Sequence, residues 1–516
     1  MEVFINIIEY VAIIMSAIIL VNKTNFVLKY YQQSHYRLSS FKKTIKYYYF
    51  GKWQYFIWGT LLFIMFLNFW YVQLIYIVYI IFLLIIFNKK KDIIKLRQTV
   101  RIYRNYFVLL LLGTIFSSTL LLLFDLPELV ASLAIILFLL PVLILISSVI
   151  VLPVEKLISK YYQTKAKKKL KRINPIVIGI TGSFGKTSTK NILYEFLKEK
   201  YITLATPKSY NTLNGVSLTI NEELSNIAEV FIVEMGASHV GDIGDLVALA
   251  KPKIAIFTGI TKQHLETFKT VSNIINEKAK ILESLSEDGL GFINGDDKLI
   301  LSYNLKTKAK IITFGLNNNN DYYATDIVMD ANKMKFTINF KKTSINVETK
   351  LVGKHNVYNI LAAFSVANEL KVGQADIKYQ ISLLEATKHR LSVDVVGSYT
   401  IIDDAFNSNI IGFNNALEVL DYYPEPRVLI TPGIVEAGSY EEEINYGLAI
   451  KIKDVADEVV LIQTKASDYI KKGLVDLEFK NIVVVDSFKE AKKYVFDKFQ
   501  KASILIENDV SDIYKI

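Results

Sequence analysis

The sequence predicts an α-helical transmembrane N-terminal region followed by two α/β domains. Three observations support this prediction. Long apolar blocks fill the first third of the 516 residues, short apolar strands alternate with amphipathic helices after it, and a glycine-rich loop follows the first of these strands. We expect the domains to be residues 1–172, which end in a basic linker, residues 173–390 and residues 391–516.

Composition separates the N-terminal third from the rest of the chain. The mean hydropathy of +0.30 is high for a soluble enzyme. Residues 1–172 contain 22 Lys and Arg against 6 Asp and Glu, whereas the remainder contains 38 against 44. The basic pI therefore belongs to the N-terminal third and does not indicate binding to nucleic acid. Cysteine is absent, which excludes disulfides and cysteine-ligated zinc or iron–sulfur sites.

Four apolar blocks are candidate membrane spans: Val3–Val21, Trp53–Phe87, Tyr106–Phe124 and Leu129–Pro153. A helix crosses a bilayer with about 20 apolar residues. The second block has 35 residues and polar Asn68 near its middle, so we interpret it as a hairpin of two short helices. That interpretation gives about five spans, and the alternative of one long tilted helix gives four.

Charge favours five spans. Segments 23–52, 89–104 and 156–172 are basic, and basic loops next to spans lie in the cytoplasm. Five spans with the N-terminus outside place all three segments there, which four spans cannot do. The first block lacks the basic start of a signal peptide. We therefore predict a multi-pass protein of the cell membrane with its later domains in the cytoplasm. The lysine cluster of 165–172 is either a contact for anionic membrane lipids or a solvated linker.

The second domain opens with the apolar strand Ile176–Ile180, the loop Thr181–Ser188 and a helix over 190–197. A glycine-rich turn between strand and helix presents backbone N–H groups to a polyphosphate. We expect Lys186 to reach the β- and γ-phosphates and Thr187 to bind Mg²⁺. Position 180 is Ile where the common pattern has Gly, so an ordinary turn is the alternative. The remaining loop positions expected to bind the nucleotide are Gly182, Ser183, Gly185 and Ser188.

Further strands predict two α/β domains. Runs at 230–233, 254–257 and 291–293 indicate a mostly parallel sheet with helices on both faces. A second series predicts a Rossmann-like domain, with the break near His389-Arg390. Glu234 ends its strand at the sheet edge where ligands bind, which makes it a candidate Mg²⁺ ligand. His264 follows the strand at 254–257 and is a weaker candidate. The second series is 400–402, 427–430, 459–462, 482–485 and 503–506.

These motifs resemble the Mur ligase family, ATP-dependent enzymes that form amide bonds in cell-wall precursor synthesis. The loop Thr181-Gly-Ser-Phe-Gly-Lys-Thr is similar to the family's phosphate loop, its short glycine spacing included. The resemblance covers about two thirds of the chain and is nearest to the branch that adds D-alanyl-D-alanine to a muramoyl tripeptide. In the family's order there follow Glu234-Met-Gly-Ala, His264-Leu-Glu, Asn294-Gly-Asp-Asp, Gly353-Lys-His-Asn-Val-Tyr-Asn359, His389-Arg-Leu and Asp403-Asp-Ala-Phe-Asn-Ser-Asn409.

The resemblance implies ATP and Mg²⁺ as cofactors and gives roles to individual positions. Lys278 aligns with the lysine that the family carbamylates, and nearby Lys280 is the alternative assignment. A carbamate is an anionic oxygen ligand for Mg²⁺, which an ammonium group cannot be. The implied metal ligands are Thr187, Glu234, His264 and Lys278, the implied catalytic residues are Lys186, Lys278 and His264, and the implied further nucleotide contacts are Asn356, Asn359, Arg390 and Asp404.

The implied reaction joins a carboxylate to an amine through an acyl phosphate. It would add D-alanyl-D-alanine or an amino acid to a peptidoglycan precursor at the cytoplasmic membrane face, with membrane cell-wall enzymes as hypothetical partners. The family's soluble UDP-binding domain has no counterpart, and segments 206–215 and 431–438 depart from the family pattern. Two alternatives remain open: a membrane-associated ligase for another polymer such as poly-γ-glutamate, and a nucleotide-binding membrane module without catalysis.

Overall fold

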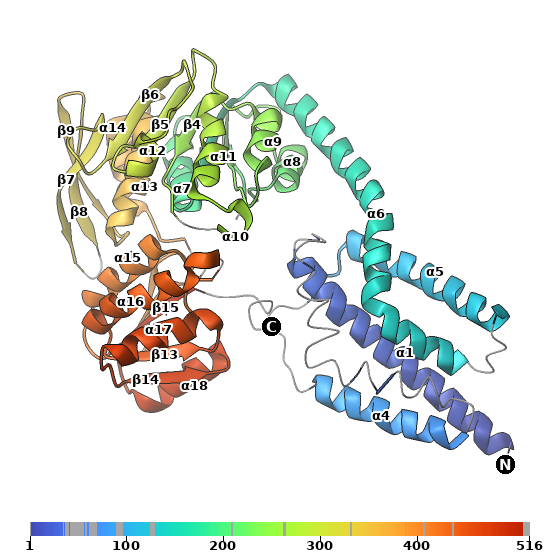
Figure 1. Cartoon of the computed structure of the whole chain (residues 1–516). Coiled ribbons are helices and arrows are strands. Elements are labelled where there is room, and N and C mark those ends of the chain that lie inside the picture. Colours follow the sequence, from blue (N-terminus) through green and yellow to red (C-terminus); the bar gives the residue numbers. More distant parts are fainter. Residues whose placement is uncertain are drawn as a thin grey trace. The chain divides into compact units, whose positions relative to one another are not determined.

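The chain divides into two compact units, a helical unit of residues 1–159 with 511–516 and an α/β unit of residues 160–510. Figure 1 shows their elements. The computed structural model describes residues 2–34, 36, 41, 56, 59–60, 70–88, 96–123, 129–207, 210–261, 265–330, 333–387, 389–405, 408–435 and 438–508.

The helical unit has polar contacts between its helices and apolar side chains on its outside. Ser16 Oγ donates to Tyr76 Oη at 3.1 Å, and Ser147 Oγ donates to Asn105 Oδ1 at 3.2 Å. Hydrogen bonds of this kind join helices in a lipid environment. The exposed apolar side chains include Phe4, Val78, Phe107, Leu110 and Ile115. The described helices are α1 (Glu2–Gln33), α4 (Trp70–Asn88), α5 (Val100–Leu123) and α6 (Leu129–Ile173).

Two described helices are long and apolar enough to cross a membrane, at Asn6–Gln33 and Ala131–Ile173, and Leu74–Leu83 is a shorter apolar helix. Helices therefore form in the first, third and last predicted blocks and in the second half of the long one. The first half of the predicted hairpin falls largely outside the described residues. The number of spans and the position of the N-terminus stay predictions.

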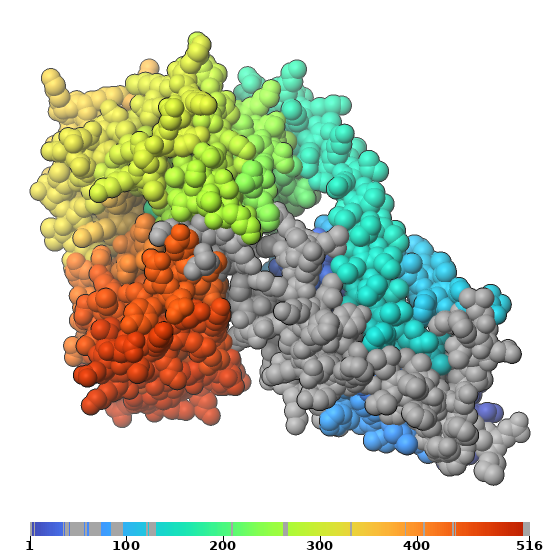
Figure 2. Space-filling model, in the orientation of Figure 1, coloured from blue at the N-terminus to red at the C-terminus, as the bar shows by residue number. Residues whose placement is uncertain are grey.

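The last part of α6, residues 160–173, belongs to the α/β unit and is not a solvated linker. Leu170 is buried in the core that also includes residues of α8 (Leu213–Glu222). Lys169 Nζ donates to the backbone oxygen of Asn221 at 3.1 Å. The basic segment is therefore a helix held on the central sheet domain. Figure 2 shows it as an exposed ridge.

The first sheet of the α/β unit has nine strands in the order β2-β3-β1-β4-β5-β6-β7-β8-β9. Strands β1 to β6 pair in parallel, as predicted, whereas β8 is antiparallel to both β7 and β9. The strands are β1 (Ile176–Thr181), β2 (Thr203–Ala205), β3 (Val230–Glu234), β4 (Ile254–Phe257), β5 (Leu290–Asn294), β6 (Lys310–Gly315), β7 (Tyr322–Met329), β8 (Met334–Phe340) and β9 (Thr343–Thr349).

Helices cover both faces of this sheet because its strands are apolar on both sides. Ile178 and Ile232 belong to one core, whereas Val177 and Val233 belong to the other. This alternation follows from the two-residue repeat of a strand. The helices are α7 (Lys186–Leu197), α8, α9 (Asp242–Ala250), α10 (Leu265–Phe268), α11 (Val271–Glu283), α12 (Lys298–Leu301), α13 (Lys354–Glu369) and α14 (Gln374–Leu383).

The second sheet has six strands in the order β10-β11-β15-β12-β13-β14. All neighbouring pairs are parallel except β10 with β11. A parallel α/β domain is therefore confirmed, and the Rossmann-like detail stays a prediction. The elements are β10 (Ser392–Val396), β11 (Tyr399–Asp404), α15 (Ile410–Asp421), β12 (Arg427–Thr431), η1 (Gly438–Tyr440), α16 (Glu441–Val455), β13 (Glu458–Ile462), α17 (Lys465–Asp476), β14 (Ile482–Val485), α18 (Phe488–Lys498) and β15 (Ala502–Glu507).

The proposed domain boundary at residue 390 lies between the two sheets, after Thr349 and before Ser392, and it stays a prediction. We call the part with the nine-stranded sheet the central domain and the part with the six-stranded sheet the C-terminal domain. All the strands expected from apolar runs are present.

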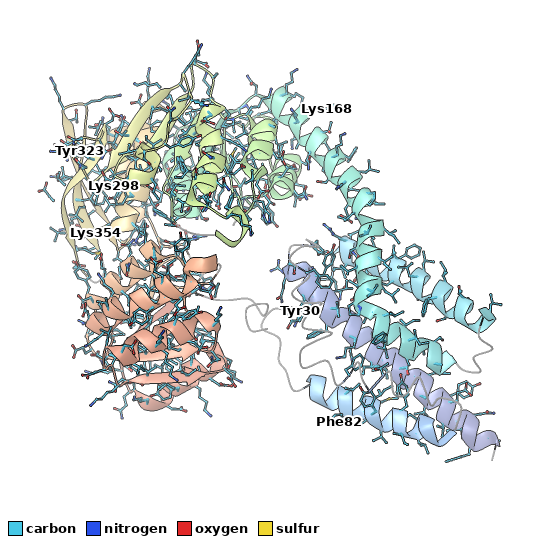
Figure 3. The ribbon with its side chains drawn as sticks, in the orientation of Figure 1. Tyr30, Phe82, Lys168, Lys298, Tyr323 and Lys354 are labelled. Atoms are coloured by element: carbon cyan, nitrogen blue, oxygen red, sulfur yellow. The ribbon has the colours of Figure 1, made fainter. Side chains whose placement is uncertain are left out.

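The packing of α6 on the central domain generates a stability prediction. Leu170→Ala removes a side chain that is only 6% exposed, so we expect the unfolding free energy to fall by about 2–4 kcal/mol. Lys168→Ala, on an exposed residue of the same helix (Figure 3), is the matched control and should change it by less than about 0.5 kcal/mol. Thermal melting of the detergent-solubilised full chain measures both. Equal melting temperatures for the two variants would contradict the buried contact.

Candidate active site

The loop after β1 needs glycine at two positions. Gly182 has φ 154° and Gly185 has φ 77°, in the region that disfavours other residues. A Cβ atom at Gly182 would lie 2.0 Å from Thr258 Oγ1, and one at Gly185 would lie 2.6 Å from Asn359 Oδ1. Gly185 is the N-cap of α7. The loop therefore leads into a helix N-terminus, which attracts anions.

Two lysines converge on one oxygen of this loop, the half-buried Lys186 and the buried Lys278. Lys186 Nζ donates to the carbonyl oxygen of Gly182 at 2.8 Å, and Lys278 Nζ donates to the same oxygen at 2.9 Å. Burial lowers the pKa of Lys186 to about 8. Burial, and after it the charge of Lys186, holds the pKa of Lys278 well below its usual range. Two ammonium groups on one oxygen repel each other, so at least one of these lysines gives up its proton readily.

The structure distinguishes Lys278 from Lys280, which lie on the same helix. Lys278 is 3% exposed and points into the loop. Lys280 has a 40% exposed side chain and pairs with Glu277 Oε2 at 2.6 Å. Only Lys278 therefore reaches the other predicted site residues.

Glu234 lies at the end of β3, as predicted, and several groups hold its carboxylate. Thr187 Oγ1 donates to Oε2 at 2.9 Å, and Asn211 Nδ2 donates to Oε1 at 2.9 Å. Lys190 Nζ is 3.6 Å from Oε2 and also donates to the backbone oxygen of Thr206 at 2.7 Å. The Glu234 carboxylate is thus fixed beside the first turn of α7.

The Thr187 and Glu234 oxygens fit a shared magnesium ion. Oxygen atoms are the ligands that Mg²⁺ prefers in proteins. Thr187 Oγ1 and Glu234 Oε2 lie 2.9 Å apart and are joined by a hydrogen bond, so both oxygens face the same point. Within the described part of the chain, no three His, Asp or Glu residues cluster as a metal site. His264 lies outside the described residues, so its predicted role stays untested.

Asn356 and Asn359 form a chain of hydrogen bonds from α13 to α7. Asn359 Nδ2 donates to Asn356 Oδ1 at 3.2 Å, and Asn359 Oδ1 accepts from Thr189 Oγ1 at 3.2 Å. Both asparagines belong to α13, and Figure 3 marks Lys354, the first residue of that helix. His355 on the next position keeps a buried Nδ1 that has no partner in the described residues, and burial lowers its pKa to about 4.

A cavity of about 560 Å³ lies beside α7. Ser188, Asn356 and Arg390, three of the predicted nucleotide contacts, line it. Leu351 and Leu384 give it apolar walls. Its mixture of apolar walls and a few polar groups is typical of a small-molecule site. The remaining wall residues include Asn191, Thr206, Gln380 and Thr387.

Arg390 and Asp404 connect the two sheet domains of the α/β unit. The Arg390 guanidinium interacts electrostatically with Glu234 of the central domain and with Asp404 of the C-terminal domain. Asp404 Oδ1 also accepts a hydrogen bond from the backbone N–H of Leu391 at 3.1 Å. The charge of Arg390 is therefore felt by the carboxylate at the end of β3 and by the carboxylate at the end of β11.

The structure brings together most predicted residues and adds others. Lys190, Thr258 and Glu507 were not singled out from the sequence. No motif marks a lysine inside a helix, a threonine after a strand or a glutamate at the end of a strand. Within the segment 206–215, Asn211 Nδ2 donates to the Glu234 carboxylate and Thr206 Oγ1 accepts from the Glu234 backbone N–H. Lys190 could have been suspected only from its position one helical turn after Lys186.

Residues 180–367 match the family described as Mur ligase middle domain. The chain is 29% identical over 294 residues to the UDP-N-acetylmuramoyl-tripeptide–D-alanyl-D-alanine ligase of Escherichia coli (strain K12), covering 56% of this chain and 65% of that one. It is 29% identical over 316 residues to the Bacillus subtilis (strain 168) enzyme of the same name, covering 60% and 67%. The match to the E. coli enzyme thus spans less than two thirds of its length.

Solved structures share the fold. MurF from Acinetobacter baumannii has a TM-score of 0.63 at 23% identity, covering 68% of this chain and 77% of that one. MurF ligase from Thermotoga maritima in complex with ADP has a TM-score of 0.62 at 23% identity, covering 69% and 81%. Residues 180–367 are thus similar to the Mur ligase middle domain. Both relatives named above are UDP-N-acetylmuramoyl-tripeptide–D-alanyl-D-alanine ligases.

The loop geometry generates a binding prediction. Gly185→Ala forces alanine into a left-handed conformation and against Asn359, so we expect ATP affinity to fall by at least about tenfold. Gly447→Ala in α16 is the control, since a Cβ there meets nothing within 4 Å, and ATP affinity should not change. Titration with a fluorescent ATP analogue measures both. Unchanged affinity in Gly185→Ala would show that the loop does not hold the nucleotide.

Proposed function

We propose that the chain is an ATP-dependent ligase that forms an amide bond through an acyl phosphate. The observation that carries this proposal is the convergence of the half-buried Lys186 and the buried Lys278 on the Gly182 oxygen, in the loop that leads to the Glu234–Thr187 oxygen pair. A phosphate loop alone serves many enzymes. A second buried lysine whose proton is easily lost, placed beside that loop and a carboxylate, is the arrangement that carbamate formation requires.

The geometry favours Lys278 as the carbamate. Carbon dioxide adds only to a neutral amine, and the pKa of Lys278 lies well below its usual range. Addition forms a nitrogen–carbon bond and releases one proton, which leaves an anionic carbamate beside the Lys186 ammonium. Repulsion between two cations is then replaced by attraction. Lys280 pairs with the Glu277 carboxylate, so its ammonium form is stabilised and no repulsion between cations favours a carbamate there.

The residues also fit a bound magnesium ion. Thr187, Glu234 and a Lys278 carbamate would hold it, with His264 as a further expected ligand. When bound, the ion would neutralise charge on the phosphates. Lys186 would move from the Gly182 oxygen to the phosphates of ATP, because a phosphate oxygen is a stronger partner than a carbonyl. The cavity beside α7 would hold the nucleoside, with Asn356 and Arg390 in its wall.

The protein's own part in catalysis would be positioning and charge neutralisation. Lys186 and Arg390 supply positive charge where the phosphoryl group moves from ATP to the substrate carboxylate. Arg390 interacts with carboxylates of both sheet domains, so it would bring the C-terminal domain to the central site. Closure there would exclude the water that otherwise hydrolyses an acyl phosphate.

The names of the relatives point to the substrates. The homologous ligases act on a UDP-N-acetylmuramoyl-tripeptide and D-alanyl-D-alanine. We propose the same reaction for this chain, with a peptidoglycan precursor as the carboxylate and the dipeptide as the amine. The departures at 206–215 and 431–438 leave room for another amine, and a polymer such as poly-γ-glutamate is the second candidate.

We propose that the helical unit anchors the enzyme in the cell membrane, with the α/β unit in the cytoplasm. The support is the set of large apolar side chains on its outside, together with hydrogen bonds between its helices. Val78 is 65% exposed and Leu110 is 66% exposed, which water would penalise and lipid would not.

The proposed reaction is tested by ADP release. Purified full-length protein with UDP-MurNAc-tripeptide, D-alanyl-D-alanine, ATP and Mg²⁺ should release ADP in proportion to amide formed. Lys186→Ala should lower this rate by about a thousandfold or more, because the cation that neutralises charge on the phosphates is lost. Release of ADP with glutamate alone would instead favour the polymer ligase. No release with any carboxylate would support a nucleotide-binding module without catalysis.

The carbamate is tested by chemical rescue. Lys278→Ala should be inactive, and millimolar formate or acetate should restore part of its activity by supplying the missing anionic oxygen. Lys280→Ala is the matched control and should retain near wild-type activity, since Lys280 pairs only with Glu277 in the described residues. Full activity of Lys278→Ala without additives would rule out this role.

Membrane topology can be measured directly because the chain has no cysteine. Single cysteines introduced as Glu2→Cys and Lys168→Cys are labelled in intact cells with a membrane-impermeant maleimide. We expect labelling at position 2 only, because five spans put the N-terminus outside and the basic helix inside. Protection of both positions in intact cells, with labelling after lysis, would indicate an even number of spans.

A further inference from the structure

A buried lysine lies next to the Glu234 carboxylate and has no role in the proposed reaction. Lys190 belongs to α7 and lies one helical turn after Lys186. Its Nζ is 3.6 Å from Glu234 Oε2, and the two side chains are only 2% and 1% exposed. Burial disfavours an isolated charge, so a buried carboxylate needs a cation close to it. Lys190 supplies that cation to Glu234.

The position of the Lys190 ammonium group is fixed by the backbone of a neighbouring segment. Its Nζ donates to the carbonyl oxygen of Thr206 at 2.7 Å. Thr206 is itself held, because its Oγ1 accepts from the Glu234 backbone N–H at 3.1 Å and its N–H donates to the Ile232 oxygen at 2.9 Å. The three residues Lys190, Thr206 and Glu234 therefore form one connected group at the end of β3.

The ammonium group acts on Glu234 through its charge. The distance of 3.6 Å to Oε2 is longer than an ordinary hydrogen bond between nitrogen and oxygen, which spans about 2.7–3.2 Å. Oε2 is also the oxygen that accepts from Thr187 Oγ1 at 2.9 Å, on the side where we expect the magnesium ion. Lys190 thus neutralises this oxygen without a hydrogen bond that an incoming ion would have to break.

The other cations that act on Glu234 are engaged elsewhere. Lys186 donates to the Gly182 oxygen and is expected to turn to the phosphates of ATP. Arg390 lines the cavity beside α7 and interacts with Asp404 as well as with Glu234. Within the described part of the chain, the ion pair of Glu234 is the one with Lys190. Lys190 is therefore the cation whose place does not depend on a nucleotide.

We propose that Lys190 is a positioning residue that takes the place of the magnesium ion before the ion binds. The inference rests on the proposed magnesium site and adds the group that keeps Glu234 charged and directed at Thr187 without the ion. Its bond to Thr206 keeps the ammonium group at a fixed distance while the ion enters. Because two cations near one carboxylate oxygen repel each other, Lys190 also weakens magnesium binding.

The experiment measures Mg²⁺ binding by thermal melting of the detergent-solubilised full chain without nucleotide. Lys190→Met removes the charge and keeps the length of the side chain. Its melting temperature without Mg²⁺ should lie below that of the wild type, because a buried carboxylate has lost its cation. Millimolar MgCl₂ should raise it more than in the wild type. The apparent dissociation constant for Mg²⁺ should fall by about tenfold, since the ion meets no neighbouring ammonium group.

Lys200→Met is the matched control. Lys200 lies on the surface and also donates to backbone oxygens, those of Leu370 and Lys371 at 3.2 and 2.7 Å. Its removal should leave the response to MgCl₂ unchanged. Lys190→Arg keeps the positive charge and should respond like the wild type. KCl at the same ionic strength separates ion binding from general screening.

The outcomes distinguish this inference from the magnesium site on which it rests. An equal response to MgCl₂ in the wild type and in Lys190→Met overturns the role of Lys190 and leaves the magnesium site in place. The absence of a response in both proteins contradicts the magnesium site and the inference together. Release of ADP by the wild type shows separately whether the ligase function holds.

A double variant tests whether the effect passes through Glu234. Lys190→Met combined with Glu234→Gln removes both buried charges, so it should melt above Lys190→Met without Mg²⁺ and lose the enlarged response. An enlarged response that persists in the double variant overturns the proposal. If Lys190→Met does not fold, Lys190→Gln is used, which keeps a polar group toward Thr206 without the charge. Its response must then exceed that of the wild type, and an equal response rejects the proposal.

Discussion

The Gly182 carbonyl oxygen is the point on which the active-site architecture depends. It accepts from Lys186 and from Lys278, so it joins the phosphate loop to α11. The loop can take this shape only because glycine at 182 fits against Thr258. Burial lowers the pKa of both lysines that approach this oxygen, so a neutral amine forms there more easily than at an exposed lysine. The carbamate chemistry that we propose follows from this one crowded contact.

A second constraint links the two sheet domains. Each has a carboxylate at a strand end, the buried Glu234 on β3 and the half-buried Asp404 on β11, and Arg390 interacts electrostatically with both. Glu234 also has Thr187, Asn211 and Lys190 as partners in its own domain. Arg390 therefore adds a charge interaction that both domains share.

Packing of α6 shows how one helix can serve two environments. Its first part is apolar and has exposed side chains such as Val149, whereas its last part buries Leu170 in the central core. The apolar composition of the first part predicts its helix. The second part was interpreted as a linker, because its many lysines outnumber the few apolar residues that pack toward α8.

The sequence by itself determined the phosphate loop, the buried parallel strands and the apolar helices, because each depends on local patterns of glycine and apolar residues. Lys186, Thr187 and Glu234 could be named on those grounds. Only tertiary structure separated Lys278 from Lys280, since both lie on one helix and differ in which side meets the loop. The antiparallel strands β7 to β9 were also missed, because their sequences are mixed and half-exposed. The pairing of Asp404 with Glu507 joins residues far apart in the chain, and only the register of two neighbouring strands decides it.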